Sequence, residues 1–271
     1  MRHSRKKTVH HSTAPLWLIF VLLMALALLL ANCDRVKAAA EQFGGELAAP
    51  AALVPQEEAQ DLLPQEGQPQ PGEVELQMQN PELPNGCEVT SLAMVLTAWG
   101  YPADKVTLAD NCLPCEDFLF DEAGNRMGPD PDQAYAGDPA SATGGWYCLE
   151  GPIVTAANAW ISSNGGGAQA QALTGLSREE LEEFAQAAVP LVVWITRDYQ
   201  PVEYADYFSW QLPDGSTCTP YNDLHCVVLA GEENGSYRIA DPLNGWQLVD
   251  PETFWQSFSG MGCRAVAIQP E

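Results

Sequence analysis

The distribution of apolar residues divides the chain into three parts. Residues 16–31 form an unbroken apolar run near the start. Residues 41–73 are rich in Ala, Gln, Glu and Pro without a regular period, and such a composition buries too little apolar surface to offset the entropy lost on ordering. Residues 74–271 carry seven of the eight tryptophans and are long enough for one sizeable core. We therefore expect a targeting segment over 1–40, a disordered linker over 41–73 and one folded domain over 74–271.

Helical periodicity marks the beginning of the domain. Apolar residues recur there every three or four positions, at Val89, Leu92, Ala93, Leu96 and Trp99. Asn85 fits the N-cap and Glu88 the third helical position, as in a capping box, and Gly100 fits the stop. The pattern predicts a helix whose first turn contains Cys87.

Later segments predict two more helices and a buried strand. Residues 151–163 are bounded by glycines and have helical composition. A second capping box at Ser177 opens a helix that Pro190 ends, and the continuous apolar run 191–195 follows it. That run has the length and β-branched content of a buried strand.

A β-hairpin is predicted near the C-terminus, with strands at 227–230 and 236–242. A five-residue loop over 231–235 would place Asp241 directly opposite His225. A four-residue loop would place Pro242 there instead. Only the first pairing brings a carboxylate to the histidine.

The N-terminal segment has the features of a secretion signal. Arg2, Arg5, Lys6 and Lys7 precede the apolar run, and small residues over 36–40 resemble a signal-peptidase site. The run could also remain as an anchor, and Cys33 offers a weak lipoprotein box. All three interpretations place the rest of the chain outside the cytoplasm, secreted or attached to the outer face of the membrane or cell wall.

Charge narrows the possible partners. Residues 1–40 hold six of the 12 basic residues and one of the 36 acidic residues, so residues 41–271 have 6 basic and 35 acidic residues, a net charge of −29. Such a domain repels nucleic acids. A peptide or protein partner, especially a cationic one, is compatible with this charge, although acidity for solubility alone is equally compatible.

The cysteine count fits an extracellular domain with one unpaired thiol. Seven cysteines follow the targeting segment, an odd number, so at least one stays free in an oxidising compartment. Four of them, in Gly-, Pro- and Asp-rich loops, are expected to form disulfides: Cys112, Cys115, Cys148 and Cys218. Cys112 and Cys115 could instead hold zinc, but no second pair and no nearby histidine support a metal site.

The candidate chemistry is that of a thiol nucleophile and its base. Cys87 at a helix start would have its thiolate stabilised by free backbone amides and the helix dipole, which lowers the pKa. His225 is the only histidine after residue 40, so a histidine base for this thiol has one possible identity. Asp241 could orient the imidazole. Taken alone, the cysteine is as compatible with a small buried hydrophobe, and the histidine with a strand cap.

Ordered segments of the domain resemble the peptidase C-39-like proteins, relatives of the bacteriocin-processing double-glycine peptidases. The similar blocks are 81–94 around Cys87, 128–131 and 136–139 in the middle of the domain, 224–231 around His225, 240–245 around Asp241, and the terminal 261–268. The resemblance implies an α+β, papain-like fold, with a nucleophile helix packed on an antiparallel sheet. It also implies Cys87 as nucleophile, His225 as general base and Asp241 as the orienting residue of a monomeric cysteine peptidase that needs no cofactor.

One expected part of such a site is harder to assign. A glutamine amide upstream of the cysteine is expected to stabilise the oxyanion, and Gln79 is the candidate, although it lies eight residues before Cys87. Asp130, Asp132 and Asp138 could bind calcium but more simply form a solvated loop. Two rival functions remain: an inactive domain that binds a peptide or cell-wall ligand, and a cell-wall amidase or acyl-transferase with the same triad.

Overall fold

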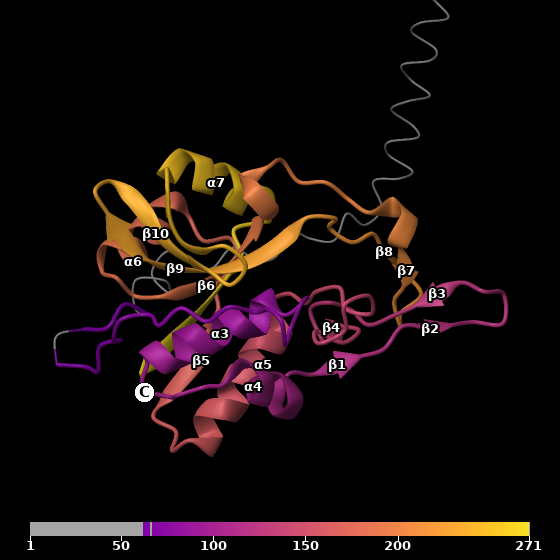
Figure 1. The fold of residues 1–271 in the computed structure, drawn as a ribbon, viewed down its shortest axis with the longest axis horizontal. Coiled ribbons are helices and arrows are strands. Elements are labelled where there is room, and N and C mark those ends of the chain that lie inside the picture. Colours follow the sequence, from indigo (N-terminus) through magenta and orange to yellow (C-terminus); the bar gives the residue numbers. More distant parts are fainter. Residues whose placement is uncertain (1–61, 66, 271) are drawn as a thin grey trace, which may run out of the picture. The chain divides into compact units, whose positions relative to one another are not determined.

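The computed structural model describes residues 62–65 and 67–270, which lie within one compact unit of the chain (Figure 1). The expected targeting segment and most of the expected linker therefore lie outside the described residues. Leu62 is buried among core side chains and the Gly72 amide donates to the Ala98 carbonyl, so residues before position 74 already contact the domain. Across the described ranges, no helix combines the length and apolarity needed to cross a membrane.

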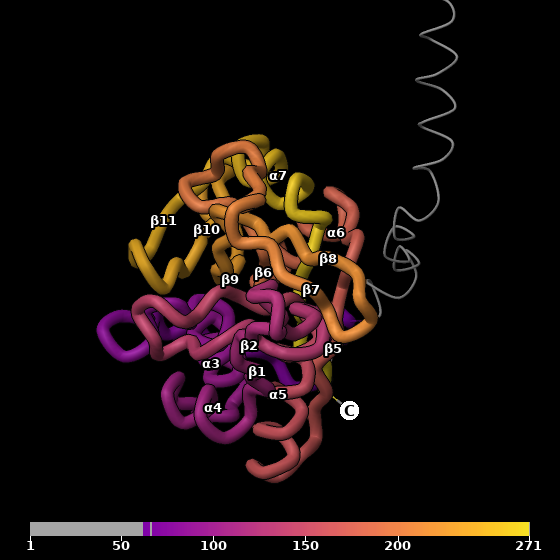
Figure 2. The backbone as a smooth tube through the Cα atoms, turned by 90° about the vertical axis from the view of Figure 1, so that its right-hand side faces the viewer, coloured from indigo at the N-terminus to yellow at the C-terminus, as the bar shows by residue number. Residues whose placement is uncertain are grey.

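A six-stranded sheet forms the centre of the domain, and all neighbouring strands in it are antiparallel. Its strand order is β11-β10-β9-β6-β12-β5, and Figure 2 labels all of these strands except β12. The strands are β5 (Ala168–Ala172), β6 (Leu191–Thr196), β9 (Leu224–Glu233), β10 (Ser236–Asp241), β11 (Gly245–Val249) and β12 (Ala265–Pro270). The predicted buried strand is thus β6, at the centre of the sheet.

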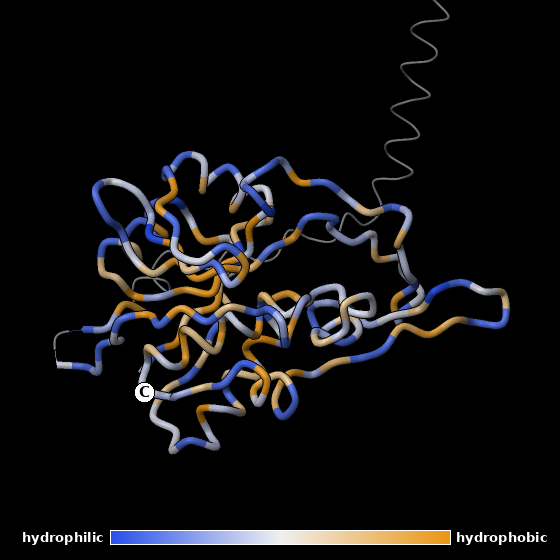
Figure 3. Tube along the Cα trace, in the orientation of Figure 1, coloured by the Kyte–Doolittle hydropathy of each residue, from blue (hydrophilic) through white to orange (hydrophobic). Residues whose placement is uncertain are grey.

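Helices cover both faces of this sheet. One face packs against α3 (Cys87–Ala98), α4 (Lys105–Cys112) and α5 (Glu150–Ser163), and the other packs against α6 (Arg178–Gln186) and α7 (Pro251–Gly260). Along β6, Val192 and Trp194 belong to the first core, whereas Val193 and Ile195 belong to the second. A strand buried on both sides needs apolar residues at every position, which explains the continuous run and the apolar centre visible in Figure 3.

Short strands extend the domain beside the main sheet (Figure 1). A two-stranded pair joins β1 (Cys115–Glu116) to β4 (Tyr135–Ala136). A second small sheet, in the order β2-β3-β7-β8, contains β2 (Leu119–Phe120), β3 (Arg126–Met127), β7 (Trp210–Gln211) and β8 (Thr217–Cys218). Two 3-10 turns, η1 (Arg197–Tyr199) and η2 (Asp206–Phe208), lie in the connection from β6 to β7.

The predicted hairpin is present as β9 and β10, but its loop differs from the expected one. The turn is the two-residue Asn234-Gly235, both with positive φ, which matches the right-handed twist of the flanking strands. A register shift between Arg238 and Ile239 then leaves Ala240 opposite Val228. Continued by one residue, this register puts Asp241 opposite Val227, so Asp241 is the diagonal rather than the direct neighbour of His225.

Candidate active site

The start of helix α3 lies against the start of strand β9, and this contact brings Cys87 to the segment that carries His225. The Ser91 hydroxyl, one turn after Cys87, donates to the Cys226 carbonyl at 3.2 Å. The Cys226 backbone amide acts on the Cys87 sulfur itself, where it favours the thiolate. Cys87 and Ser91, one helical turn apart, thus both contact Cys226, the residue that follows His225.

His225 and Asp241 form a buried pair. The His225 Nε2 lies 2.8 Å from the Asp241 Oδ1, and 2% and 3% of the two residues are exposed. The Leu243 amide, the Asn244 amide and the Asn244 side chain also donate to this carboxylate, at 2.7, 3.2 and 2.9 Å. Burial opposes ionisation, but the hydrogen bond and charge of His225 and the amide donors outweigh it and lower the pKa of Asp241.

The pair fixes the tautomer of the imidazole. Because an ionised carboxylate only accepts hydrogen bonds, Nε2 of His225 carries the hydrogen that faces Asp241. The lone pair of a neutral ring then lies on Nδ1. The arrangement therefore leaves one nitrogen that can take a proton.

The first turn of α3 differs from the predicted capping box. Gly86 is the N-cap and no side chain caps the helix. The Asn85 side-chain amide instead donates to the Ser141 carbonyl at 2.7 Å, and the Asn85 backbone carbonyl accepts from the Tyr135 hydroxyl. A Cβ at Gly86 would lie 2.7 Å from the Cβ of Leu83, so only glycine fits between this turn and the helix.

The pKa of Cys87 is raised, contrary to the expectation of a lowered value. Burial of the thiol is the largest cause, and the neighbouring Glu88 carboxylate is the second. The Cys226 amide and the charge of Arg197 act in the opposite direction but are weaker. The helix start therefore does not by itself provide a thiolate, and removal of the proton needs a base.

Glu88 is a fully buried acid directly beside the thiol. Its Oε1 accepts from the Cys148 amide at 3.0 Å, and its Oε2 lies 3.3 Å from the Cys87 Sγ, which donates to it. Burial raises the pKa of Glu88 to about 7 despite these donors. Sequence reasoning assigned this residue to helix capping, and no spacing signal distinguished that role from the buried one.

Replacement of Glu88 by glutamine should flatten the pH dependence of stability. The folded-state pKa of Glu88 exceeds the unfolded value of 4.5, so its ionisation destabilises the fold as pH rises from 4.5 through 7, by about 3 kcal/mol above pH 7. Urea denaturation at pH 5 and pH 8 measures this. Glu88→Gln should lose less stability than the wild type between these pH values, whereas Glu180→Gln, at another buried glutamate, tests the specificity of the effect. Equal pH slopes for wild type and Glu88→Gln would contradict the assignment.

Gln79 lies at the same end of the sheet. Its backbone amide donates to the carbonyl of Pro242, the residue after Asp241, at 2.9 Å. Its side-chain amide donates to the Pro84 carbonyl at 2.7 Å, and its Oε1 is buried without a hydrogen-bond partner. Gln79 is thus eight residues away from Cys87 in sequence but lies beside the loop that leads into Cys87.

The expected disulfides are not found. All seven cysteines of the described residues are free, including Cys112, Cys115, Cys148 and Cys218. Cys148 is fully buried below the site, where its amide binds Glu88 and its carbonyl accepts from Trp194. The expected loop positions also differ from the observed ones, because Cys112 ends helix α4 and Cys115 and Cys218 lie on the short strands β1 and β8.

The acidic loop residues make local contacts. Asp130 accepts from the Asp132 amide and Asp138 from the Ala140 amide, while Asp132 lies 3.5 Å from Arg264. Among the residues that the structure describes, no group of three or more His, Cys, Asp or Glu side chains has a metal-binding arrangement.

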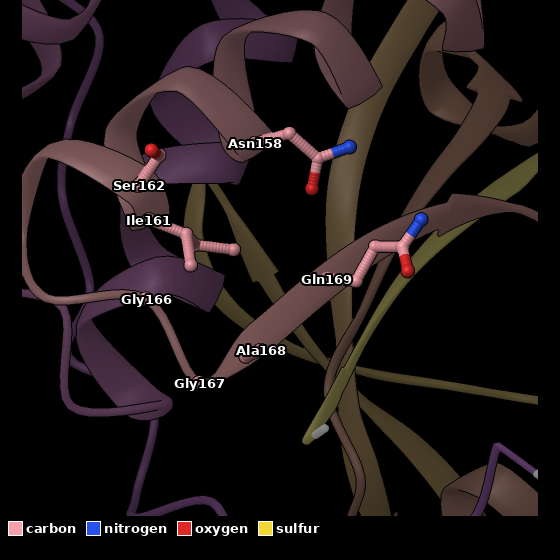
Figure 4. Close-up of a pocket in the computed structure, with 7 residues that line it drawn as sticks. All are labelled: Asn158, Ile161, Ser162, Gly166, Gly167, Ala168 and Gln169. Atoms are coloured by element: carbon pink, nitrogen blue, oxygen red, sulfur yellow. The ribbon is translucent and has the colours of Figure 1, made fainter.

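A pocket of about 280 Å³ adjoins the candidate residues. It contacts Asn85, two residues before Cys87, and Leu224, which precedes His225. The remaining lining residues are Ala142, Thr143, Gly145, Trp146, Tyr147, Arg197, Tyr221 and Asn222. A second cavity, between α5 and β5, is lined by residues without charge (Figure 4). One of them, Asn158, donates its side-chain amide to the Ala170 carbonyl and accepts from the Ala170 backbone amide. Of these two cavities, only the first is lined by residues close in sequence to Cys87 and His225.

Comparisons with known proteins give a consistent result. The sequence profile of the Peptidase_C39 like family matches residues 72–266. The chain is 32% identical over 196 residues to the uncharacterised protein YvpB of Bacillus subtilis. The aligned region covers 71% of this chain and 72% of YvpB. A crystal structure from Bacillus anthracis, assigned as a C39-like peptidase, is 30% identical with a TM-score of 0.62 and covers 73% of this chain and 95% of that one. These matches confirm the expected papain-like α+β fold.

Proposed function

Because the chain belongs to the Peptidase_C39 like family, we propose that it is a cysteine peptidase that hydrolyses peptide bonds through a Cys87 acyl-thioenzyme. The observation that supports this most strongly is the buried His225–Asp241 pair, at 2.8 Å, on the strand against which the Cys87 helix begins. A histidine held in one tautomer by a carboxylate can act as the general base for a thiol on the neighbouring element.

The proposed reaction has two steps. Nδ1 of His225 takes the proton from Cys87, the sulfur attacks the substrate carbonyl, and the protonated imidazole then gives its proton to the leaving amine. Water then gives a proton to the same nitrogen and attacks the thioester, the C–S bond breaks to release the carboxylic acid, and the Cys87 sulfur takes the proton back from the imidazolium. Asp241 holds the ring and stabilises the imidazolium. Because burial and Glu88 raise the pKa of the Cys87 thiol, attack by its sulfur depends on proton transfer to His225.

Gln79 is our candidate for the oxyanion donor. Its amide has two hydrogens, and the Pro84 carbonyl takes one, so the other is available together with the Cys87 backbone N–H. Gln79→Ala should lower kcat about 10²- to 10³-fold, measured on any peptide that the wild type cleaves. Gln77→Ala is the matched control, since its amide binds the Ala103 carbonyl instead. Equal losses in both variants would refute the role of Gln79.

We place the domain outside the cytoplasm, secreted or tethered through the N-terminus. The basic residues before an apolar run of 16 residues support this location. The partner is a peptide or protein, and the net charge of −29 over residues 41–271 disfavours nucleic acids.

The proposal is tested with a peptide library. The full chain and its Cys87→Ala variant are incubated with a mixture of decapeptides of random sequence, and the products are sequenced by mass spectrometry. Wild-type cleavage that the variant lacks is expected. Hydroxylamine in a parallel reaction distinguishes hydrolysis from acyl transfer, because a transferase would form hydroxamates without a matching acid product. Identical product profiles from wild type and variant would overturn the proposal.

A second function is supported by the burial of the thiol. Cys87 is 8% exposed and its pKa is raised, which also suits an inactive papain-like domain that binds a peptide or cell-wall ligand. Such a domain would cleave no library peptide and would bind its ligand equally well as Cys87→Ala.

A further inference from the structure

Arg197 lies next to the candidate catalytic residues at the end of strand β6. In the sheet, Thr196 pairs with Leu224 and Ile195 pairs with His225. Arg197 is the next residue, and its backbone amide donates to the Asp223 carbonyl at 2.7 Å. Its side chain is exposed, lines the 280 Å³ pocket and acts electrostatically on the Cys87 sulfur.

Arg197 differs from the other cations of the domain. Of the basic residues from position 62 onward, Lys105, Arg178 and Arg264 form ion pairs, and Arg126 and Arg238 stack on the rings of Phe208 and Trp246. Within the described part of the chain, no carboxylate lies within ion-pair distance of Arg197. Asp223 interacts with it only at longer range. Its guanidinium is therefore available to a ligand.

The pocket around Arg197 also differs in charge from the rest of the domain. Its ten lining residues include one cation and no acid, although residues 41–271 contain 35 acidic and 6 basic residues. Tyrosine, tryptophan and asparagine side chains make up most of the remaining large lining groups. A cationic group in a pocket without acidic walls attracts an anion, and guanidinium binds carboxylate through two parallel hydrogen bonds.

We propose that Arg197 forms a carboxylate-binding subsite of this pocket, which selects peptides that carry a carboxylate close to the bond attacked by Cys87. That the substrate is a peptide rests on the proposed function. The carboxylate could come from an acidic side chain or from the C-terminus of a short peptide. In both cases the immediate substrate contact is anionic, whereas the net charge of the domain alone favours cationic partners.

The first test needs no knowledge of the substrate. Iodoacetate and iodoacetamide have nearly the same shape, but only iodoacetate carries a carboxylate. Their rates of alkylation at Cys87 are measured in the full chain by peptide mapping. Arg197→Gln should lower the iodoacetate-to-iodoacetamide rate ratio roughly threefold to fivefold, the effect of an exposed charge pair. Arg197→Lys should retain part of the preference, and Arg238→Gln, with the same change in net charge, should leave the ratio unchanged.

The second test separates the two sources of carboxylate. Binding of hexapeptides to the Cys87→Ala variant is measured by calorimetry, in pairs that differ by Glu against Gln or by a free against an amidated C-terminus. A preference for Glu assigns the subsite to a side chain, and a preference for the free C-terminus assigns it to the chain end. Loss of either preference in Arg197→Gln supports the inference even if no peptide is hydrolysed, so its outcome is distinct from that of the peptidase proposal. Unchanged alkylation ratios together with no carboxylate preference in binding would overturn it.

Discussion

Replacement of His225 by alanine should slow alkylation of Cys87 by iodoacetamide at pH 7 by at least about 100-fold, the usual contribution of a positioned base. Burial and the Glu88 carboxylate raise the pKa of Cys87, so few molecules carry a thiolate unless the imidazole accepts the proton. Peptide mapping of the full chain after timed exposure to the reagent measures the rate at each cysteine.

The same chain contains an internal control for this prediction. Cys115 is exposed on strand β1 and forms no hydrogen bond to a base among the residues that the structure describes, so His225→Ala should leave its labelling unchanged. A general loss of labelling at both cysteines would indicate a change in folding, which far-UV circular dichroism detects. Equal rates at Cys87 in wild type and His225→Ala would contradict the assignment of His225 as the base.

Asp241→Ala should reduce the free energy of unfolding by about 3–5 kcal/mol, the cost of breaking a buried charged pair. The substitution leaves the His225 Nε2–H and the backbone amides of Leu243 and Asn244 without their acceptor. These donors cannot turn to water instead, because His225 and Asp241 are only 2% and 3% exposed. Urea denaturation at pH 7 measures the loss. Asp241→Asn keeps an oxygen that can accept from all three donors. We therefore expect it to lose less than half as much free energy of unfolding as Asp241→Ala.

The dependence of the free energy of unfolding on pH below about 4 provides an independent check on the role of Asp241. Its folded-state pKa is lowered, so its stabilising contribution is present above the unfolded value of about 3.9 and is lost as pH falls through the lower folded value. Asp241→Asn should therefore be less sensitive than the wild type to acidification below pH 4. A stability loss in Asp241→Ala equal to that in Asp241→Asn would show that the shared acceptor is not what holds this corner of the sheet.

The hydrophobic pattern identified the main elements because burial on both faces leaves a clear signature. The run at 191–195 became the central strand β6, and the capping box at Ser177 opens α6 as expected. The pairing of His225 with Asp241 was also anticipated, but from the wrong loop. The Asn234-Gly235 dipeptide favours a two-residue turn, and a register shift on β10 restores the contact diagonally.

Other features depend on contacts that sequence patterns do not contain. Glu88 fits a helix cap by position, but its carboxylate points to the Cys148 amide, 60 residues away in sequence. The pKa of Cys87 follows the burial of its thiol and the neighbouring Glu88 carboxylate rather than its place at the helix start. Arg197 belongs to no sequence motif, and its place near the site follows only from the antiparallel pairing of the preceding residue, Thr196, with Leu224.

The central claim is that Cys87 is the nucleophile of peptide hydrolysis, and the most direct measurement relates activity to modification of this one thiol. The full chain is alkylated with iodoacetamide to increasing extents, and each sample is assayed for hydrolysis of a cleaved library peptide and for the fraction of Cys87 modified. We expect residual hydrolysis to fall in proportion to modified Cys87 and to reach zero when the site is fully alkylated. Hydrolysis that persists after complete modification of Cys87 would contradict the account.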